Sequence, residues 1–170
     1  MRNKFDKRDS LELGTSAQEQ FQELAVKRGW HVTRATKEQD IDEHWDYLIK
    51  NSAGQEYKVD VKARKRISRW DESVQEDWVW VELHGVRQHD AGWLFGGTAE
   101  LIAFEKKNCF VLITKSALQE IVKEYVTTTE EVSSAERAKY KIYSRPGRHD
   151  KLSLVEMKHI EANAWEIWKK

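Results

Sequence analysis

The sequence predicts an α/β (α+β) protein whose central mixed β-sheet is flanked by helices. Helical spacing of apolar residues starts near Thr15, and alternation of apolar and polar side chains marks residues 46–62 as a pair of strands. Two apolar runs at 101–104 and 110–113 enclose a short polar turn, a pattern typical of a buried β-hairpin. Helical spacing returns over residues 115–125. Helices on either side of such strands favour a layered α/β domain.

The first expected helix begins at Thr15 or Ser16, either of which can cap it. It ends at Gly29, and residues 30–34 are then expected to form a strand. Residues 35–44 are expected to be a polar, acid-rich loop. The apolar stripe of the helix consists of Ala17, Phe21, Leu24 and Ala25.

Residues 46–62 are expected to form two strands joined by a turn. In the second strand two valines alternate with Asp60 and Lys62, so the valines can enter a core while the charged pair points to the opposite face. The intervening Asn-Ser-Ala-Gly is favourable turn sequence. If the strands fold back about this turn, Asp46 lands beside Asp60.

The second half of the chain is expected to add strands and two helices. A strand is expected over residues 78–83, and a long glycine-containing loop follows it. After the helix at 115–125, the polar segment 127–139 is expected to contain only a short helix opened by Ser133. The remaining expected elements are strands at 140–143 and 152–155 and a last helix carrying Ile160, Ala164, Ile167 and Trp168.

The length and the cysteine content bound the class of protein. A chain of 170 residues suits a single domain with its own core, and the mixed-charge residues 1–12 are expected to be a flexible arm. Cys109 is the only cysteine in the sequence, which excludes an intrachain disulfide and a cysteine-based zinc site. No segment has the apolar character of a membrane span or of a secretory signal, so a cytoplasmic protein is expected.

The overall charge gives no signal for a nucleic-acid partner. The sequence has 29 Lys and Arg residues and 29 Asp and Glu residues, so its formal net charge is zero. A role with nucleic acid must therefore rest on local clusters of charge. The eight tryptophans can fill a core, but they can also stack on bases or anchor interfaces.

Carboxylates near the hairpin suggest a metal site. Asp46 and Asp60 can converge with Lys62, and Glu19 of the first helix can join them. Carboxylates suit Mg²⁺, which keeps several waters and takes one or two protein ligands plus phosphate oxygens. Such an ion can activate water for attack on a phosphodiester. The competing interpretation of an Asp-x-Lys strand is an ordinary solvated face.

The order of these residues resembles the PD-(D/E)XK nuclease superfamily, which includes restriction endonucleases and archaeal Holliday-junction resolvases. Asp46 matches the first acid of the family. Asp60 and Lys62 match its (D/E)-x-K element, within the segment YKVDVKARKR. Glu19 matches the acid that many members carry on their first helix.

The resemblance implies a restriction-endonuclease-like core and an endo- or exonuclease that depends on Mg²⁺ or Mn²⁺. Within it, Asp46, Asp60 and the Val61 carbonyl would bind the metal. Glu19 would hold a metal-bound water or a second ion, and Lys62 would assist the attacking water.

The resemblance covers residues 14 to about 66 well and the strands and helix between 78 and 125 less clearly. Two features depart from the family pattern. Trp45 stands where many members have a proline, and a strand containing Glu82 follows the hairpin before any long second helix.

A basic segment leaves the second strand of the hairpin, and further cations and an aromatic residue come from two later loops. These side chains could contact phosphates or stack on bases, although solvated surface is the alternative for each. The candidate nucleic-acid-binding residues are Arg64, Lys65, Arg66, Arg69, Arg87, Trp93, Arg145 and Arg148.

Three further residues are candidates for accessory roles. Glu82 and His84 stand two apart on an expected strand, which places them on one face, where they could extend the metal site. His44 is close to Asp46 in sequence and could move a proton. An ordinary polar strand face and a loop histidine are the respective alternatives.

The leading functional hypothesis is a metal-dependent nuclease, with DNA favoured over RNA by the family resemblance. The alternatives are an RNA nuclease of the same fold, including one that cuts tRNA, and a catalytically inactive nucleic-acid-binding or protein-interaction module. A homodimer is also considered, with Trp165 and Trp168 as candidate contact residues.

Overall fold

The structure, a computed structural model, describes residues 7–170. Its helices are α1 (Lys7–Lys27), α2 (Lys37–Glu43), α3 (Gly92–Gly96), α4 (Lys115–Tyr125), α5 (Met157–Ala162) and the 3-10 helix η1 (Ala135–Arg137). Its strands are β1 (His31–Arg34), β2 (Tyr47–Lys50), β3 (Glu56–Lys62), β4 (Trp78–His84), β5 (Leu101–Glu105), β6 (Cys109–Thr114), β7 (Thr127–Val132), β8 (Lys141–Ser144), β9 (Lys151–Glu156) and β10 (Glu166–Lys169).

The strands form two mixed sheets. The six-stranded sheet has the order β1-β2-β3-β5-β6-β10, in which β3 and β5 run parallel and the other neighbours run antiparallel. The four-stranded sheet has the order β4-β9-β8-β7, with β7 and β8 parallel. The predicted mixed α/β class is confirmed, whereas the division of the strands into two sheets was not predicted.

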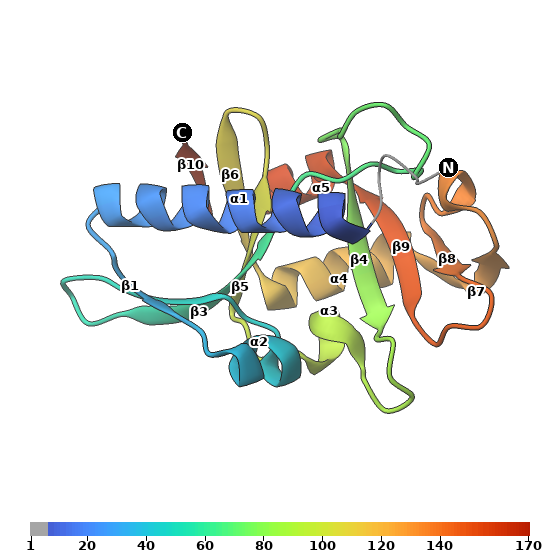
Figure 1. Cartoon of the computed structure of the whole chain (residues 1–170), viewed down its shortest axis with the longest axis horizontal. Helices are drawn as coiled ribbons and strands as arrows, with labels where there is room; N and C mark the ends of the chain where they lie inside the picture. Colours follow the sequence, from blue (N-terminus) through green and yellow to red (C-terminus); the bar gives the residue numbers. More distant parts are fainter. Residues whose placement is uncertain (1–6) are drawn as a thin grey trace.

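Helix α1 covers one face of the six-stranded sheet (Figure 1). It does so because Ala17, Phe21 and Ala25 lie on one side of the helix, where all three are fully buried. The Phe21 ring stacks on Trp168 of β10 with 5.4 Å between ring centres, and on Tyr47 of β2 with 6.0 Å. The helix therefore holds β2 and β10 in a common core.

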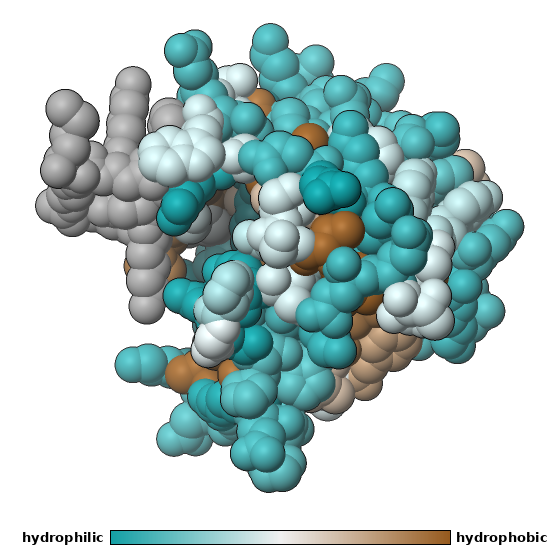
Figure 2. Space-filling model, turned by 90° about the vertical axis from the view of Figure 1, so that its right-hand side faces the viewer, coloured by the Kyte–Doolittle hydropathy of each residue, from teal (hydrophilic) through white to brown (hydrophobic). Residues whose placement is uncertain are grey.

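The opposite face of this sheet packs against α4, α5 and the four-stranded sheet. Ile102 and Val111 from the six-stranded sheet meet Leu118 of α4 and Val79 and Val155 of the second sheet in one buried cluster. The second sheet lies at one end of the molecule (Figure 1), and Figure 2 shows that this end presents a largely hydrophilic surface. The charged face of β3 thus lies between two layers of the protein.

The beginning of α1 corrects the expectation of a flexible arm over residues 1–12. Residues 7–12 belong to the helix, and residues 1–6 lie outside the described part of the chain. The apolar spacing used to find the helix starts only where the helix meets the sheet, so its earlier, polar turns gave no signal. Thr15 and Ser16 are interior helical residues and do not cap α1.

The expected loop at residues 35–44 is corrected as well, because residues 37–43 form α2. Thr36 caps it: its hydroxyl accepts a hydrogen bond from the Gln39 amide at 3.2 Å, and the Gln39 side chain accepts one from the Thr36 amide at 2.9 Å. This capping box lacks a following apolar stripe, since no residue of α2 is buried. The usual helical pattern was therefore absent.

The end of the chain corrects the expected last helix. α5 stops at Ala162, and Ile167 and Trp168 belong to β10, the edge strand beside β6. Trp168 is fully buried, so it is not available as the surface contact residue that the homodimer hypothesis assumed. Trp165 packs against Trp30 and Tyr57.

The segment 127–139 forms β7 and η1 in place of the expected short helix. The other expected strands, the hairpin at 101–113 and the helix at 115–125 are confirmed within one or two residues. In the described part of the chain, every helix is too short or too polar to cross a membrane.

Candidate active site

The β2–β3 hairpin brings Asp46 and Asp60 together. Tyr47 pairs with Val59 across the antiparallel ladder, so Asp46, directly before β2, stands opposite Asp60. The Asp46 and Asp60 side chains are on a charged face, as predicted, but this face is covered: the two residues are only 8% and 5% exposed. The hairpin therefore creates a buried carboxylate pair.

Asp46 is fixed by two hydrogen bonds. The Gln18 side-chain amide donates to Oδ1 at 2.7 Å, and the Val61 backbone amide donates to Oδ2 at 2.7 Å. Burial, followed by the negative charge of Asp60, raises the pKa of Asp46 to about 7, while the Val61 hydrogen bond opposes this shift. The Asp46 carboxyl thus resists ionisation beside Asp60, and a cation near the pair would favour its charged form.

Lys62 supplies one such cation. Its Nζ lies 2.7 Å from Asp60 Oδ2, and it also lies 4.5 Å from the centre of the Trp93 ring of α3. The contact with Asp60 is an ion pair without hydrogen-bond geometry, and Asp60 Oδ2 has no hydrogen-bond partner among the described residues. Lys62 is thus held between the Asp60 carboxylate and the face of the Trp93 ring.

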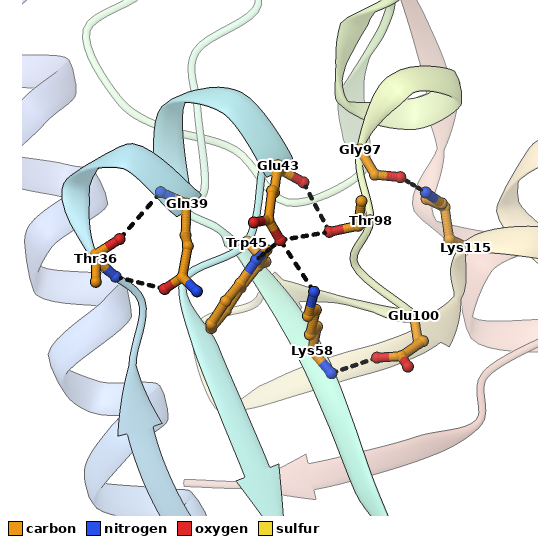
Figure 3. A network of polar contacts seen from close by, with 9 residues as sticks. All are labelled: Thr36, Gln39, Glu43, Trp45, Lys58, Gly97, Thr98, Glu100 and Lys115. Carbon is orange, nitrogen blue, oxygen red and sulfur yellow. Dashed lines mark hydrogen bonds and ion pairs between the residues drawn. The ribbon is translucent and has the colours of Figure 1, made fainter.

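A polar network fixes the chain just before Asp46 (Figure 3). Glu43 Oε2 accepts hydrogen bonds from Trp45 Nε1 at 2.8 Å, from Lys58 Nζ at 3.0 Å and from the Thr98 hydroxyl at 3.2 Å. The Trp45 and Lys58 hydrogen bonds lower the pKa of Glu43. The Thr98 amide also donates to the Glu43 carbonyl at 2.8 Å. This network ties the end of α2 to β3 and to the segment before β5, and so positions the start of β2.

Glu19 does not join the carboxylate pair. The structure places it on the exposed side of α1, in a surface hollow with Gln22 and Glu23. The preceding residue, Gln18, is the helical side chain that reaches Asp46. The expectation that Glu19 binds metal is therefore corrected, because a shift of one helical position turns the side chain by about 100°.

Of the accessory candidates on β4, Glu82 reaches the site region and His84 does not. Glu82 Oε1 accepts a hydrogen bond from the Trp93 amide at 3.2 Å. Burial raises the pKa of Glu82, while this hydrogen bond and then the charge of Lys62 oppose the shift. The register of β4 with β9 shifts between Glu82 and His84, so the two residues no longer share one strand face. His84 instead contacts the carbonyl of Gly85.

α2 adds two ionisable groups beside the carboxylate pair. His44 lies at the C-terminal end of α2 in a left-handed conformation, and its Nε2 is 3.5 Å from Asp90 Oδ1. Asp40 shares a hollow of about 240 Å³ with Asp46, and desolvation and the charge of Asp60 raise its pKa. Asp40 was not predicted as a site residue because its segment was interpreted as a loop. The four acidic residues among positions 35–44 could have indicated a charged site there.

Several predicted nucleic-acid-binding residues line one cavity with Lys62. This inter-sheet cavity has a volume of about 940 Å³ and lies between the end of β3, β4 and the turn that joins β8 to β9. Figure 2 shows a hollow at the end of the molecule that carries the second sheet. The predicted residues that line the cavity are Lys65, Arg69, Trp93, Arg145 and Arg148.

The other predicted basic residues have different positions. Arg64 pairs with the buried Glu105, with 4.0 Å between Nε and Oε2. Arg66 Nη1 donates to Asp9 of α1 at 2.6 Å. Alternation along the extended chain sends these two arginines away from the side that Lys65 occupies.

Arg87 lies outside the inter-sheet cavity as well. It is an exposed residue of the loop after β4, 3.6 Å from Asp42. The structure thus does not bring Arg64, Arg66 and Arg87 to the cavity that Lys62 lines.

The residues at the carboxylate pair fit a divalent cation. Asp60 Oδ2 is a buried acceptor that the Lys62 ammonium approaches to 2.7 Å without hydrogen-bond geometry, and Asp46 keeps acceptor capacity beyond its two hydrogen bonds. The Val61 carbonyl lies on the same side of β3 as its amide, and therefore toward Asp46. No group of three His, Cys, Asp or Glu side chains close enough for one ion occurs within residues 7–170. A site of two carboxylates, one carbonyl and water suits Mg²⁺.

Comparison of the chain with models of protein families, with curated proteins and with solved structures finds no match in any of the three.

Proposed function

We propose that this protein is a Mg²⁺- or Mn²⁺-dependent nuclease of the PD-(D/E)XK type, with DNA as the favoured substrate. One observation carries the proposal: two buried carboxylates and an ion-paired lysine lie together where a cavity rich in cations begins. Buried carboxylates that repel each other are costly unless a cation binds between them. Their position beside a cavity lined by cationic side chains is what such a nuclease needs.

The side chains have distinct roles in this proposal. Asp46, Asp60 and the Val61 carbonyl hold the metal, and Gln18 orients Asp46 through its hydrogen bond. A bound Mg²⁺ would act as a Lewis acid toward the phosphodiester and its attacking water. Lys62 places an ammonium group beside Asp60, where it can orient the water or stabilise negative charge on the phosphate.

The restriction-endonuclease-like core is part of the same proposal. It is supported by a helix packed on a sheet in which β1, β2 and β3 are consecutive antiparallel neighbours. The two acids sit at the start of β2 and within β3, in the order that the family motif requires. β5 lies parallel to β3 on its other side and closes the floor of the site.

A cleavage assay tests the proposal. Purified protein is incubated with labelled linear, circular, branched and single-stranded DNA and with RNA, in Mg²⁺, Mn²⁺ or EDTA. We expect metal-dependent cleavage that Asp60→Asn and Lys62→Met each reduce by about 100-fold or more. Glu19→Gln is the matched control, and it should keep wild-type activity because Glu19 points away from the site.

Two results would reject the DNA nuclease. One is the absence of metal-dependent cleavage, or equal cleavage by wild type and by the Asp60 and Lys62 variants. The other is cleavage of RNA alone, which would assign the site to an RNA nuclease of the same fold.

A further inference from the structure

The inter-sheet cavity is a partly open space lined by residues of both sheets. The segment after β3 contributes Lys65 and Arg69, β4 contributes Trp80, and the β8–β9 turn contributes Arg145 and Arg148. Its volume of about 940 Å³ lies at the upper end of the range of about 300–1,000 Å³ that is usual for ligand sites. The inter-sheet cavity is thus a ligand-sized space with walls from both sheets, unlike the open face across which a duplex would lie.

Positive charge is concentrated in this cavity, although the whole chain is neutral. Five cationic side chains line it against three carboxylates. Asp150, one of the three, is buried and ion-paired with Arg145. Lys65 is exposed as a residue, and its pKa is lowered, first by desolvation and then by the charge of Lys62, while Asp60 and Glu82 oppose the shift. A bound phosphate would supply the missing negative charge.

Aromatic side chains lie among these cations. Trp70 is 70% exposed, and the Arg69 guanidinium lies 4.9 Å from the centre of its ring. Trp80 and Tyr143 form a second aromatic pair with 5.7 Å between ring centres. These three aromatic residues line the cavity. Exposed aromatic rings next to phosphate-binding cations are the usual means of binding bases without sequence preference.

We propose that the inter-sheet cavity binds a single-stranded segment of nucleic acid and leads it to Lys62. The identity of the ligand rests on the proposed nuclease function. In a duplex both faces of a base are covered by neighbouring base pairs, whereas an unpaired strand offers its bases to Trp70, Trp80 and Tyr143. Lys65, Arg145 and Arg148 contact the phosphates of the same strand. The substrate class is therefore unpaired DNA.

Equilibrium binding in EDTA tests this inference. The full chain is titrated into labelled single-stranded DNA about 12 nucleotides long, within the usual site sizes, and into a blunt duplex of the same sequence. We expect the single strand to bind at least about tenfold more tightly. Trp70→Ala and Arg148→Gln, two changes at exposed side chains, should each weaken binding about fivefold or more. Arg87→Gln, an exposed arginine outside the cavity, is the control and should bind as wild type does.

Equal or tighter binding of the duplex, or wild-type binding by both cavity variants, would overturn the inference. So would competition by thymidine monophosphate at the concentrations at which the unlabelled strand competes, because the cavity would then bind free nucleotides. Because EDTA prevents metal-dependent cleavage, the two proposals can fail separately. Preferred binding of single strands without cleavage in Mg²⁺ would reject only the nuclease, whereas cleavage without strand preference would reject only the inference drawn here.

Discussion

Asp46 keeps a carboxyl group buried beside a second carboxylate, at a cost to the fold. Its pKa of about 7 means that the folded protein resists the negative charge that the unfolded chain accepts readily. Residues at functional sites often trade stability for a local field that a ligand requires. The cluster of Asp46, Asp60 and Lys62 has this character, since a divalent cation would relieve the repulsion.

The titration of Asp46 predicts how a neutral replacement changes stability. The unfolded carboxyl ionises near pH 3.8, whereas folded Asp46 keeps its proton up to about pH 7, so the free energy of unfolding decreases between these values. Asp46→Asn removes this loss and can keep the hydrogen bond from Val61. In EDTA, we expect Asp46→Asn to be more stable than wild type by about 2 kcal/mol at pH 8 and by much less at pH 4.

Urea denaturation of both proteins at the two pH values measures this difference. The Glu19→Gln variant is the control, because it removes an exposed carboxyl on the same helix that supports Asp46. An Asp46→Asn protein that is no more stable than wild type at pH 8 would show that Asp46 is not electrostatically strained.

The positions of the candidate site residues were predictable where strand alternation defines them. Asp46, Asp60 and Lys62 follow from the hairpin register, which the turn sequence and the alternating valines determine. The residue of α1 that contacts Asp46 is Gln18, whereas Glu19, one position later, was predicted. Glu19 was predicted because it is charged, but the packing of α1 on the sheet decides which side of the helix faces Asp46.

At the scale of elements, β10 shows how tertiary packing overrides a local pattern. Residues 160–168 have apolar spacing compatible with a helix, but the chain turns after α5 and the last strand pairs with β6. In that strand Trp168 points into the core and neighbouring Ile167 points outward. A helical extension would instead separate the two side chains by about 100° around the helix axis, within one broad apolar stripe.

Substitutions in β10 distinguish the two arrangements. We expect Trp168→Ala to lower the free energy of unfolding by about 3–5 kcal/mol, because the side chain is 0% exposed and stacks on Phe21. Ile167→Ala, at a position that is 46% exposed, should cost less than about 1 kcal/mol. Chemical denaturation of the two variants gives both values, and similar losses in the two would contradict the strand assignment.

α2 and β7 show a second limit of the sequence. α2 buries none of its residues, and β7 is exposed over most of its length, so neither has the apolar periodicity on which prediction depends. By contrast, β5, β6 and α4 were predictable because each buries a continuous run or stripe of apolar side chains. Elements with few buried residues, such as α2 and β7, could therefore be identified only from the structure.

At the scale of the molecule, the two sheets place cations from distant parts of the chain in one cavity. Lys65 and Arg148 are far apart in sequence, and they meet because β9 pairs with β4 and brings the β8–β9 turn toward the end of β3. Both residues were predicted from the sequence as candidates for phosphate contacts. Their position in one cavity was not predictable, because the pairing of β4 with β9 rather than with the central sheet leaves no local signal.

The salt dependence of binding measures how many of these cations meet phosphates. For a single strand, each phosphate contact changes the slope of log K against log salt by about 0.7. We expect Lys65→Gln and Arg148→Gln each to reduce the slope by about that amount, and Arg87→Gln to leave it unchanged. Anisotropy titrations across a range of salt concentrations provide the slopes. Equal slopes for all four proteins would place the phosphates outside the inter-sheet cavity.

The most direct test of the carboxylate pair as a metal site is a crystal structure after soaking in Mn²⁺, located by its anomalous scattering. We predict an ion bound by Asp46, Asp60 and the Val61 carbonyl, with Lys62 still beside Asp60. The same soak of Asp60→Asn crystals should show no ion at this position. Two results would contradict a metal site here: wild-type crystals that show no manganese between Asp46 and Asp60, or Asp60→Asn crystals that bind the ion as well as wild type does.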